Sequence, residues 1–321
     1  MSDEDASNDI DPLRDLFAHV QPRVTPPEAD DAEIRRALFA EWDAITGRRV
    51  LIKRFGAAAA AAALIIGFGT LLLRTSPAPA AVVASVERVR GNVEVDGAAL
   101  TVGGRISSSA RIDTHSGQVA LRLDGGGSLR LAPQTRLTFA DSGRATLDAG
   151  ALYFDSEAGA AATHLEVRTA FGTVRDVGTQ LVARFADDSL EVDVRDGRVT
   201  IGRAADSIDI RAGERVSVTS AASAPRREAI ATFGAEWEWA ERLAPPFEID
   251  GRPLIDFLRW IEAQTGRTLV FADAASEQAA RDTMLSGTVD LEPLLKLAAV
   301  IATTDLDYSL EGERIVIRAD K

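Results

Sequence analysis

Residues whose types could do chemistry are few in this chain of 321 residues, and their spacing fits no reaction. The glycines of Asp124-Gly-Gly-Gly-Ser128 are typical of a phosphate-binding loop. The segment lacks GxGxxG spacing, a following lysine and a following helix, so we interpret it as a hairpin turn between two strands. The carboxylates at Asp187-Asp188 and at Glu236 and Glu238 have spacings typical of solvated strands or loops.

Histidine and cysteine usage narrows the chemistry further. The chain has three histidines, His19, His115 and His164, and no cysteine, which excludes disulfides, thiolate metal sites and cysteine nucleophiles. Each histidine is isolated in sequence from metal-ligand spacings and from any GxSxG elbow. We therefore expect no catalytic residue, no metal and no cofactor, and a protein that is not an enzyme. A net charge of −13 without clustered Lys and Arg argues against direct nucleic-acid binding.

The longest uncharged segment of the chain is the stretch at residues 55–73. Its 19 residues just cross a hydrocarbon core of about 30 Å as a helix. Four basic residues, Arg48, Arg49, Lys53 and Arg54, precede it and only Arg74 follows. The positive-inside rule then puts the N-terminus in the cytoplasm and the rest of the chain outside. We predict a single transmembrane helix in the inner membrane, with the C-terminal domains in the periplasm.

Two other interpretations of this stretch fit its length and position less well. A buried core helix rarely has so long an uncharged run. A cleaved signal peptide would agree with Ala78-Pro79-Ala80, but 54 residues precede the run, whereas secretory signals have a short N-region. Arg48-Arg49-Val-Leu-Ile-Lys53 resembles a twin-arginine signal, so export by that route or by the general route stays open.

The segment at 1–54 predicts two short helices separated by Pro22, Pro26 and Pro27. The second helix carries one apolar stripe, formed by Ile34, Leu38, Trp42 and Ile45. So short a segment buries little area by itself, and we expect the stripe to bind a partner. Alternatively, the two helices pack on each other or the second lies on the membrane surface.

After a Pro/Ala linker at 74–84, the pattern changes to alternating apolar and polar residues. Over 85–222 short alternating runs are separated by Gly or Asp turns about every 8–12 residues, which predicts an all-β sandwich, roll or solenoid-like domain. A connector follows at 223–246. Its Glu-Trp-Glu-Trp sequence at 236–239 indicates either an edge strand or aromatic packing between domains.

Residues 247–321 predict a small α+β domain with two βαβ-like units. Helices are expected after Pro253, ending at Gly266, and around Leu291 to Ile301. Strands are expected at 247–249, 268–271 and 284–289, followed by a C-terminal hairpin that turns at Glu311-Gly312.

The order of these segments and several β-domain motifs resemble the FecR family of transmembrane sigma-factor regulators. The matching segments occur in order over about residues 85–218, and they include Leu121 to Leu131, Leu147 to Asp155, Thr173 to Ala183, Asp193 to Val199 and Ile210 to Arg215. Ala151 stands where the family usually has an acidic residue. The resemblance implies structural roles for Asp124, Gly125, Ser128, Gly150, Tyr153, Phe154, Gly178, Thr179, Gly197 and Gly213.

The last 75 residues resemble the secretin/TonB short N-terminal (STN) module through Pro253-Leu254, Gln264-Thr-Gly266 and Leu285-Ser-Gly-Thr-Val289. Together these resemblances imply an anti-sigma factor. An extracytoplasmic-function sigma factor would bind Ile34, Leu38, Trp42 and Ile45, and the signalling domain of a TonB-dependent outer-membrane receptor would act from the periplasm. The family's N-terminal domain usually has more Trp residues than this chain. The alternative is a membrane-anchored periplasmic binding or scaffold protein without sigma-factor activity.

Overall fold

The computed structural model describes residues 36, 81–156, 164–203, 206–220 and 223–319. The helices expected in 1–54 and the uncharged run at 55–73 therefore lie outside the described residues, apart from Arg36. Among the residues that are described, no helix has the length and apolarity needed to span a bilayer. The chain divides into one unit up to Pro77 and another from Ala78 to Lys321, and the elements below belong to the second.

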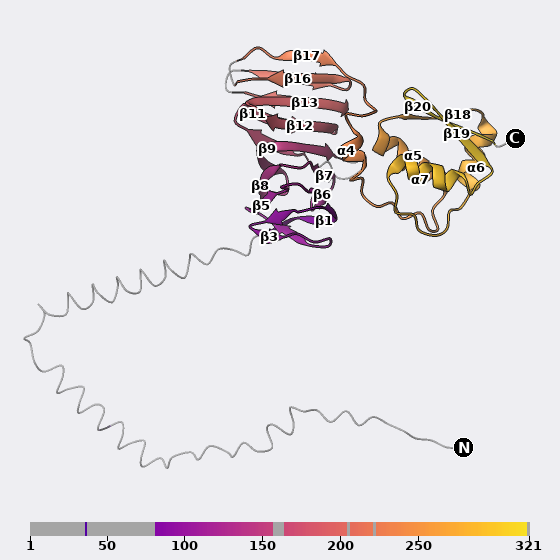
Figure 1. Ribbon diagram of the computed structural model, residues 1–321, viewed down its shortest axis with the longest axis horizontal. Coiled ribbons are helices and arrows are strands. Elements are labelled where there is room, and N and C mark those ends of the chain that lie inside the picture. Colours follow the sequence, from indigo (N-terminus) through magenta and orange to yellow (C-terminus); the bar gives the residue numbers. More distant parts are fainter. Residues whose placement is uncertain (1–35, 37–80, 157–163, 204–205, 221–222, 320–321) are drawn as a thin grey trace, which may run out of the picture. The chain divides into compact units, whose positions relative to one another are not determined.

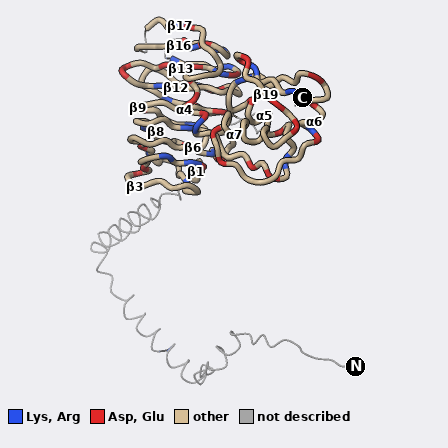
Figure 2. Tube along the Cα trace, turned by 45° about the vertical axis from the view of Figure 1, so that its right-hand side comes forward, with Lys and Arg blue, Asp and Glu red and all other residues tan. Residues whose placement is uncertain are grey.

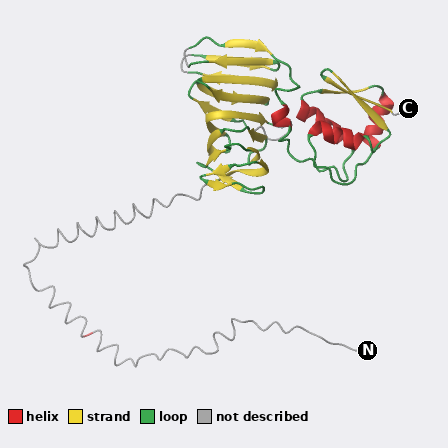
Figure 3. Ribbon diagram, in the orientation of Figure 1, coloured by secondary structure: helices red, strands yellow, loops and turns green. Residues whose placement is uncertain are grey.

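Residues 82–229 form two β-sheets that run in chain order from one end to the other (Figures 1 and 3). The first layer has the order β4-β1-β6-β7-β9-β12-β13-β16-β17. Its strands are β1 (Val82–Arg90), β4 (Arg105–Ser107), β6 (Gln118–Leu123), β7 (Ser128–Leu131), β9 (Arg144–Asp155), β12 (Gln180–Ala186), β13 (Ser189–Asp196), β16 (Glu214–Val218) and β17 (Arg226–Ala229).

The second layer has the order β3-β2-β5-β8-β9-β10-β11-β14-β15. Its further strands are β2 (Glu94–Val95), β3 (Ala98–Ala99), β5 (Arg111–Asp113), β8 (Arg136–Asp141), β10 (Glu166–Thr169), β11 (Gly172–Asp176), β14 (Arg198–Gly202) and β15 (Ser207–Arg211). The chain passes between the layers after every one or two strands. This confirms the all-β expectation, and the sequential order corresponds to its solenoid-like form.

The core lies between the layers because alternate side chains of each strand point inward. Leu121 of β6 and Leu137 of β8 come from different layers and belong to the same fully buried cluster. Strand β9 belongs to both layers and changes from one to the other near Gly150. Gly150 has φ +92°, and a Cβ there would lie 2.4 Å from the Cα of Thr135, so only glycine fits this corner.

The β-structure is longer at both ends than the 85–222 range predicted from the sequence. Strand β1 begins at Val82, inside the expected linker, where Val82 pairs with Ser107. Strand β17 extends the first layer into the expected connector. The connector continues into a short helix, α4 (Glu238–Glu241), so an edge strand at the Trp pair is wrong. Trp237 is buried against Tyr153, with ring centroids 6.4 Å apart, which is the aromatic-packing alternative.

Residues 247–319, called the C-terminal unit below, pack helices on a sheet of order β18-β20-β19. Its elements are α5 (Leu254–Thr265), β18 (Thr268–Phe271), α6 (Ala274–Asp282), α7 (Pro293–Ile301), β19 (Leu306–Glu311) and β20 (Arg314–Ala319). Strand β18 is parallel to β20, and β19 and β20 form the expected hairpin. A separate apolar cluster, with Phe257, Leu297 and Ile315 at its centre, forms the core.

Two predictions for this unit are wrong. Residues 247–249 and 284–289 form no strand, and the one isolated bridge nearby joins Met284 to Pro253, so the unit does not consist of two βαβ-like repeats. Residue Leu285 pairs instead with the turn at 251–252, where its amide donates to the Arg252 carbonyl and its carbonyl accepts from the Gly251 amide. The structure also contains α6, which begins where the side chain of Asp273 accepts a hydrogen bond from the Ser276 amide.

Candidate functional site

The Asp124–Ser128 segment is a hairpin turn between β6 and β7, as predicted. The Gly126 amide donates to the Leu123 carbonyl, and the Leu123 amide donates to the Gly127 carbonyl. Asp124 and Gly125 are exposed, whereas Ser128 is buried at the start of β7. These residues shape a turn at one end of the first layer.

Tyr153 and Phe154 are neighbours on β9, and their side chains lie on opposite faces of the first layer. Phe154 belongs to the core between the layers, whereas Tyr153 packs with Val182, Trp237 and Ala240 on the outer face. Both are fully buried. Around Tyr153 the outer face of the first layer is therefore covered, by residues of the connector.

The remaining motif residues close turns at the ends of strands. Gly178, Gly197 and Gly213 all have φ between +73° and +78°. A Cβ on Gly197 would lie 2.3 Å from the Gly178 carbonyl, so these two loops touch through their backbones. The Thr179 hydroxyl donates to Asp176, whose pKa is raised by burial.

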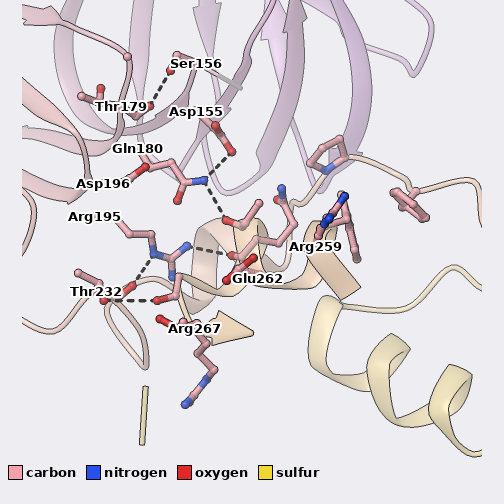
Figure 4. A pocket seen from close by; sticks show the side chains of 18 of the residues that line it. Asp155, Ser156, Thr179, Gln180, Arg195, Asp196, Thr232, Arg259, Glu262 and Arg267 are labelled. Atoms are coloured by element: carbon pink, nitrogen blue, oxygen red, sulfur yellow. Dashed lines mark hydrogen bonds between the residues drawn. The ribbon is translucent and has the colours of Figure 1, made fainter. Parts of the chain in front are cut away.

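Beside these turns, the outer face of the first layer presents Arg195, which donates two hydrogen bonds to the C-terminal unit (Figure 4). Arg195 lies at the end of β13 and is 3% exposed. Its Nη1 donates to the Gln264 carbonyl at 2.9 Å, and its Nη2 donates to the Thr265 carbonyl at 3.2 Å. Nε donates to the Thr232 carbonyl at 2.7 Å. Arg195 thus joins β13, the connector and the end of α5.

Residues of the connector and α4 hold the Arg195 side chain in place. Its Nη2 lies 2.6 Å from Oε1 of Glu241, and its guanidinium stacks 4.6 Å above the ring of Trp237. Burial raises the pKa of Glu241, and the charge of Arg195 opposes this shift. The β-structure, the connector and α4 therefore fix the position of the Arg195 guanidinium independently of its contacts with α5.

A second buried arginine, Arg130 of β7, reaches the same helix. It donates through Nη2 to the side-chain oxygen of Gln264 and through Nη1 to the Ala240 carbonyl at 2.7 Å. Its guanidinium lies 4.7 Å from the ring centre of Tyr153, its cross-strand partner on β9. Burial lowers the pKa of Arg130, and burial raises the pKa of Tyr153 to about 12.

Gln180 of β12 completes the set. Its Nε2 donates to the Ala263 carbonyl at 2.9 Å and to Asp155 at 3.1 Å, as Figure 4 shows. The last carbonyls of a helix lack intrahelical donors. Here Ala263, Gln264 and Thr265 receive theirs from β12 and β13. Helix α5 then ends at Gly266 in the left-handed conformation, as the sequence predicted.

A cavity of about 870 Å³ lies along this contact. Its lining from the β-structure includes Asp155, Thr179 and Asp196, and its lining from the C-terminal unit includes Trp260 and Arg267. Charged residues of both signs occur where the two regions meet (Figure 2). Within the described residues, no group of three or more His, Asp or Glu side chains has the arrangement of a metal site. The contact between the β-structure and the carboxyl end of α5, which we call the joint, has the geometry of a binding surface.

Some of the motif residues lie at or beside the joint. Ser128 and Tyr153 lie next to its arginines and Trp237, Gly178 and Thr179 line the cavity, and Gly197 contacts Gly178. Ile34, Leu38, Trp42 and Ile45 lie outside the described residues. Sequence reasoning missed Arg130, Gln180 and Arg195. Neither arginine carries a distinguishing local signal, because both occupy ordinary polar positions of alternating strands, β7 and β13.

Comparison with known proteins gives one family match. Residues 110–200, which span β5 to β14, match the family described as FecR protein. No curated protein matches the chain.

Two crystal structures are similar in part, both of a protein from Parabacteroides distasonis ATCC 8503 that is provisionally described as an anti-sigma factor. One is 16% identical with a TM-score of 0.34, covering 65% of this chain and 97% of that one. The other is 17% identical with a TM-score of 0.35, covering 64% and 97%. The match to a described family is therefore the FecR match, and it is confined to residues 110–200, from β5 to β14.

Proposed function

We propose that this protein is a single-pass regulator of an extracytoplasmic-function sigma factor, anchored in the inner membrane. The observation that supports this proposal most directly is the FecR match over residues 110–200, which form the middle of the two-layer β-structure. The uncharged run at 55–73 has the length of a membrane span. The basic residues before it favour a cytoplasmic N-terminus and periplasmic C-terminal domains.

On the cytoplasmic side, the proposed contact with the sigma factor is the apolar stripe of Ile34, Leu38, Trp42 and Ile45. An amphipathic helix of this kind binds by laying its apolar face into a groove of its partner. On the periplasmic side, the proposed input is the signalling domain of a TonB-dependent receptor, received by the β-structure and an STN-like C-terminal unit. The polar joint between these two regions supports a role in binding rather than in catalysis.

Co-purification of the full chain with the sigma factor encoded beside its gene tests the proposal. We expect capture by the wild-type chain and loss of capture in Leu38→Asp and Trp42→Asp, because burying a charge in the apolar contact costs several kcal/mol. Asp43→Asn, a change outside the stripe, is the matched control and should capture normally. Absence of capture by the wild-type chain would refute sigma-factor regulation.

The second candidate is an anchored periplasmic binding or scaffold protein without sigma-factor activity. It is favoured by the joint itself, which is fully built within residues 81–319, in the proposed periplasmic part. A sigma-factor gene next to this one favours the first candidate, and its absence favours the second.

A further inference from the structure

The β-structure and the C-terminal unit have separate apolar cores. Among the described residues of 81–319, the cluster between the two β-layers and the cluster around α5 and α7 share no residue. The contacts that cross between the two regions include the bonds of Arg130, Gln180 and Arg195 and the exposed ion pair of Arg88 with Asp290. A polar contact of this kind between domains permits relative motion more readily than a large apolar one.

The bonds made by the three side chains share one target, the carboxyl end of α5. That end carries unsatisfied carbonyls and a partial negative charge, which favour a cation. The planar guanidinium of Arg195 places two N–H groups on adjacent carbonyls, which the single ammonium of a lysine does not reproduce. The outer face of the first layer is thus shaped to bind a helix carboxyl terminus.

This binding surface is assembled without the C-terminal unit. Arg195 keeps Glu241, Trp237 and the Thr232 carbonyl as partners, and Arg130 keeps Tyr153 and the Ala240 carbonyl. All of these belong to the β-structure or the connector. If α5 moved away, both arginines would retain partners and gain water. Opening the joint therefore leaves no buried charge unpaired.

The joint also has space beside it, and the segment that crosses it has no regular structure. The cavity of about 870 Å³ lies between the two walls, so the contact is incompletely filled. Residues 244–249 link α4 to the C-terminal unit without helix or strand structure.

We propose that Arg130, Gln180 and Arg195 form a latch that holds the C-terminal unit closed on the β-structure by capping α5, and that the unit opens as a rigid body when the latch is released. This inference concerns residues 81–319 and is independent of the identity of any sigma factor.

Distance measurements between two spin labels on the full chain test the latch. The chain has no cysteine, so Ser207→Cys on β15 and Ser286→Cys in the C-terminal unit, both exposed, give one label on each region. Pulsed electron spin resonance should give one narrow distance distribution in this background. Adding Arg195→Met removes donors from the Gln264, Thr265 and Thr232 carbonyls. We expect the ratio of open to closed forms to rise about a hundredfold, with a second, broad distance population and unchanged helix content.

Arg184→Met is the matched control. Arg184 lies on β12 of the same layer and pairs with Glu191, without a contact to the C-terminal unit in its hydrogen bonds or ion pairs. It should leave the distance distribution narrow. Gln264→Ala, which removes the acceptor of Arg130 from α5, gives a second test in case Arg195→Met does not fold, and should raise the ratio of open to closed forms about tenfold.

A narrow, unchanged distribution in the folded Arg195→Met variant, or in Gln264→Ala if the former is unfolded, would overturn the latch. Equal broadening in Arg184→Met would do the same, since the effect would then not depend on capping. A broad distribution in the labelled wild-type background would contradict the closed joint itself.

Discussion

Gly266 offers a sharp test of the joint, because it ends α5 and lies against the β-structure. It has φ +63°, and a Cβ built on it would lie 2.2 Å from the Thr232 carbonyl oxygen and 2.5 Å from Nε of Arg195. Gly312, in the turn of the β19–β20 hairpin, has φ +59° with nothing within 4 Å of its Cβ position. Gly266→Ala and Gly312→Ala therefore share the backbone cost and differ in the contact with the joint.

The magnitude follows from these two contributions. An alanine in the left-handed conformation costs about 1–2 kcal/mol in either variant. In Gly266→Ala the Thr232 carbonyl must also move, and it accepts the 2.7 Å hydrogen bond from Arg195. Loss of a hydrogen bond to a charged group costs about 1.5–3 kcal/mol. We expect Gly266→Ala to lower the free energy of unfolding by about 2 kcal/mol more than Gly312→Ala does.

Urea unfolding of the full chain, followed by tryptophan fluorescence, measures this difference, since Trp237 lies at the joint and Trp260 lines the cavity. If the two variants unfold within about 0.5 kcal/mol of each other, the close approach at Gly266 has no energetic role and the reasoning is refuted.

Three further predictions concern groups of different burial. The hydroxyl of Tyr153 is buried, and no hydrogen bond of ordinary geometry joins it to the neighbouring Arg195, so Tyr153→Phe should leave the free energy of unfolding unchanged or raise it by about 1 kcal/mol in urea titrations, and a loss above about 2 kcal/mol would mean that the hydroxyl is bonded to Arg195. Burial raises the pKa of Glu241, so the native state keeps a proton that the unfolded state releases, and wild-type stability falls as pH rises from about 4.3 through the raised pKa. Glu241→Gln lacks this loss, and its stability relative to wild type should therefore increase over that pH range; a constant difference would contradict the assigned pKa direction. Arg88 forms an ion pair with the 77% exposed Asp290, so Arg88→Gln should cost less than about 1 kcal/mol, with no measurable cost in high salt, whereas a larger cost would place this pair among the contacts that hold the joint.

The β-structure was predictable because its signal is local. Alternation along runs such as Val119 to Leu123 places every second side chain on one face, and turns such as Asp124–Gly127 separate the runs. The sequence does not distinguish a sandwich, a roll and a solenoid-like arrangement, because pairing between distant strands is set by tertiary contacts. The corner at Gly150 depends on the close approach of Thr135, which is 15 residues away in sequence and has no local signature.

In the C-terminal unit, the local signals gave α5, its Gly266 end and the final hairpin. Helix α6 escapes the sequence prediction because it is short and mostly polar, and its apolar residues are alanines, so no large apolar side chain marks its buried face. Its start could have been found from Asp273, a good helix cap.

The joint was not predicted, because its parts are far apart in the chain. Arg130 and Gln264 are separated by 134 residues, and Arg195 and Gln264 by 69. Each residue alone is an ordinary polar side chain. Their role follows from the register that puts β7, β9, β12 and β13 side by side. The motif residues Tyr153 and Gly197 were chosen by resemblance, and their structural surroundings supply the physical reasons.

The central claim, sigma-factor regulation by a FecR-like membrane protein, is tested most directly by cross-linking the full chain in intact cells and identifying its partners. We expect an extracytoplasmic-function sigma factor to be captured with the wild-type chain and lost in Trp42→Asp, while capture of any periplasmic partner is unchanged. Capture of periplasmic partners alone, with no sigma factor in either sample, would contradict it and would favour the anchored scaffold.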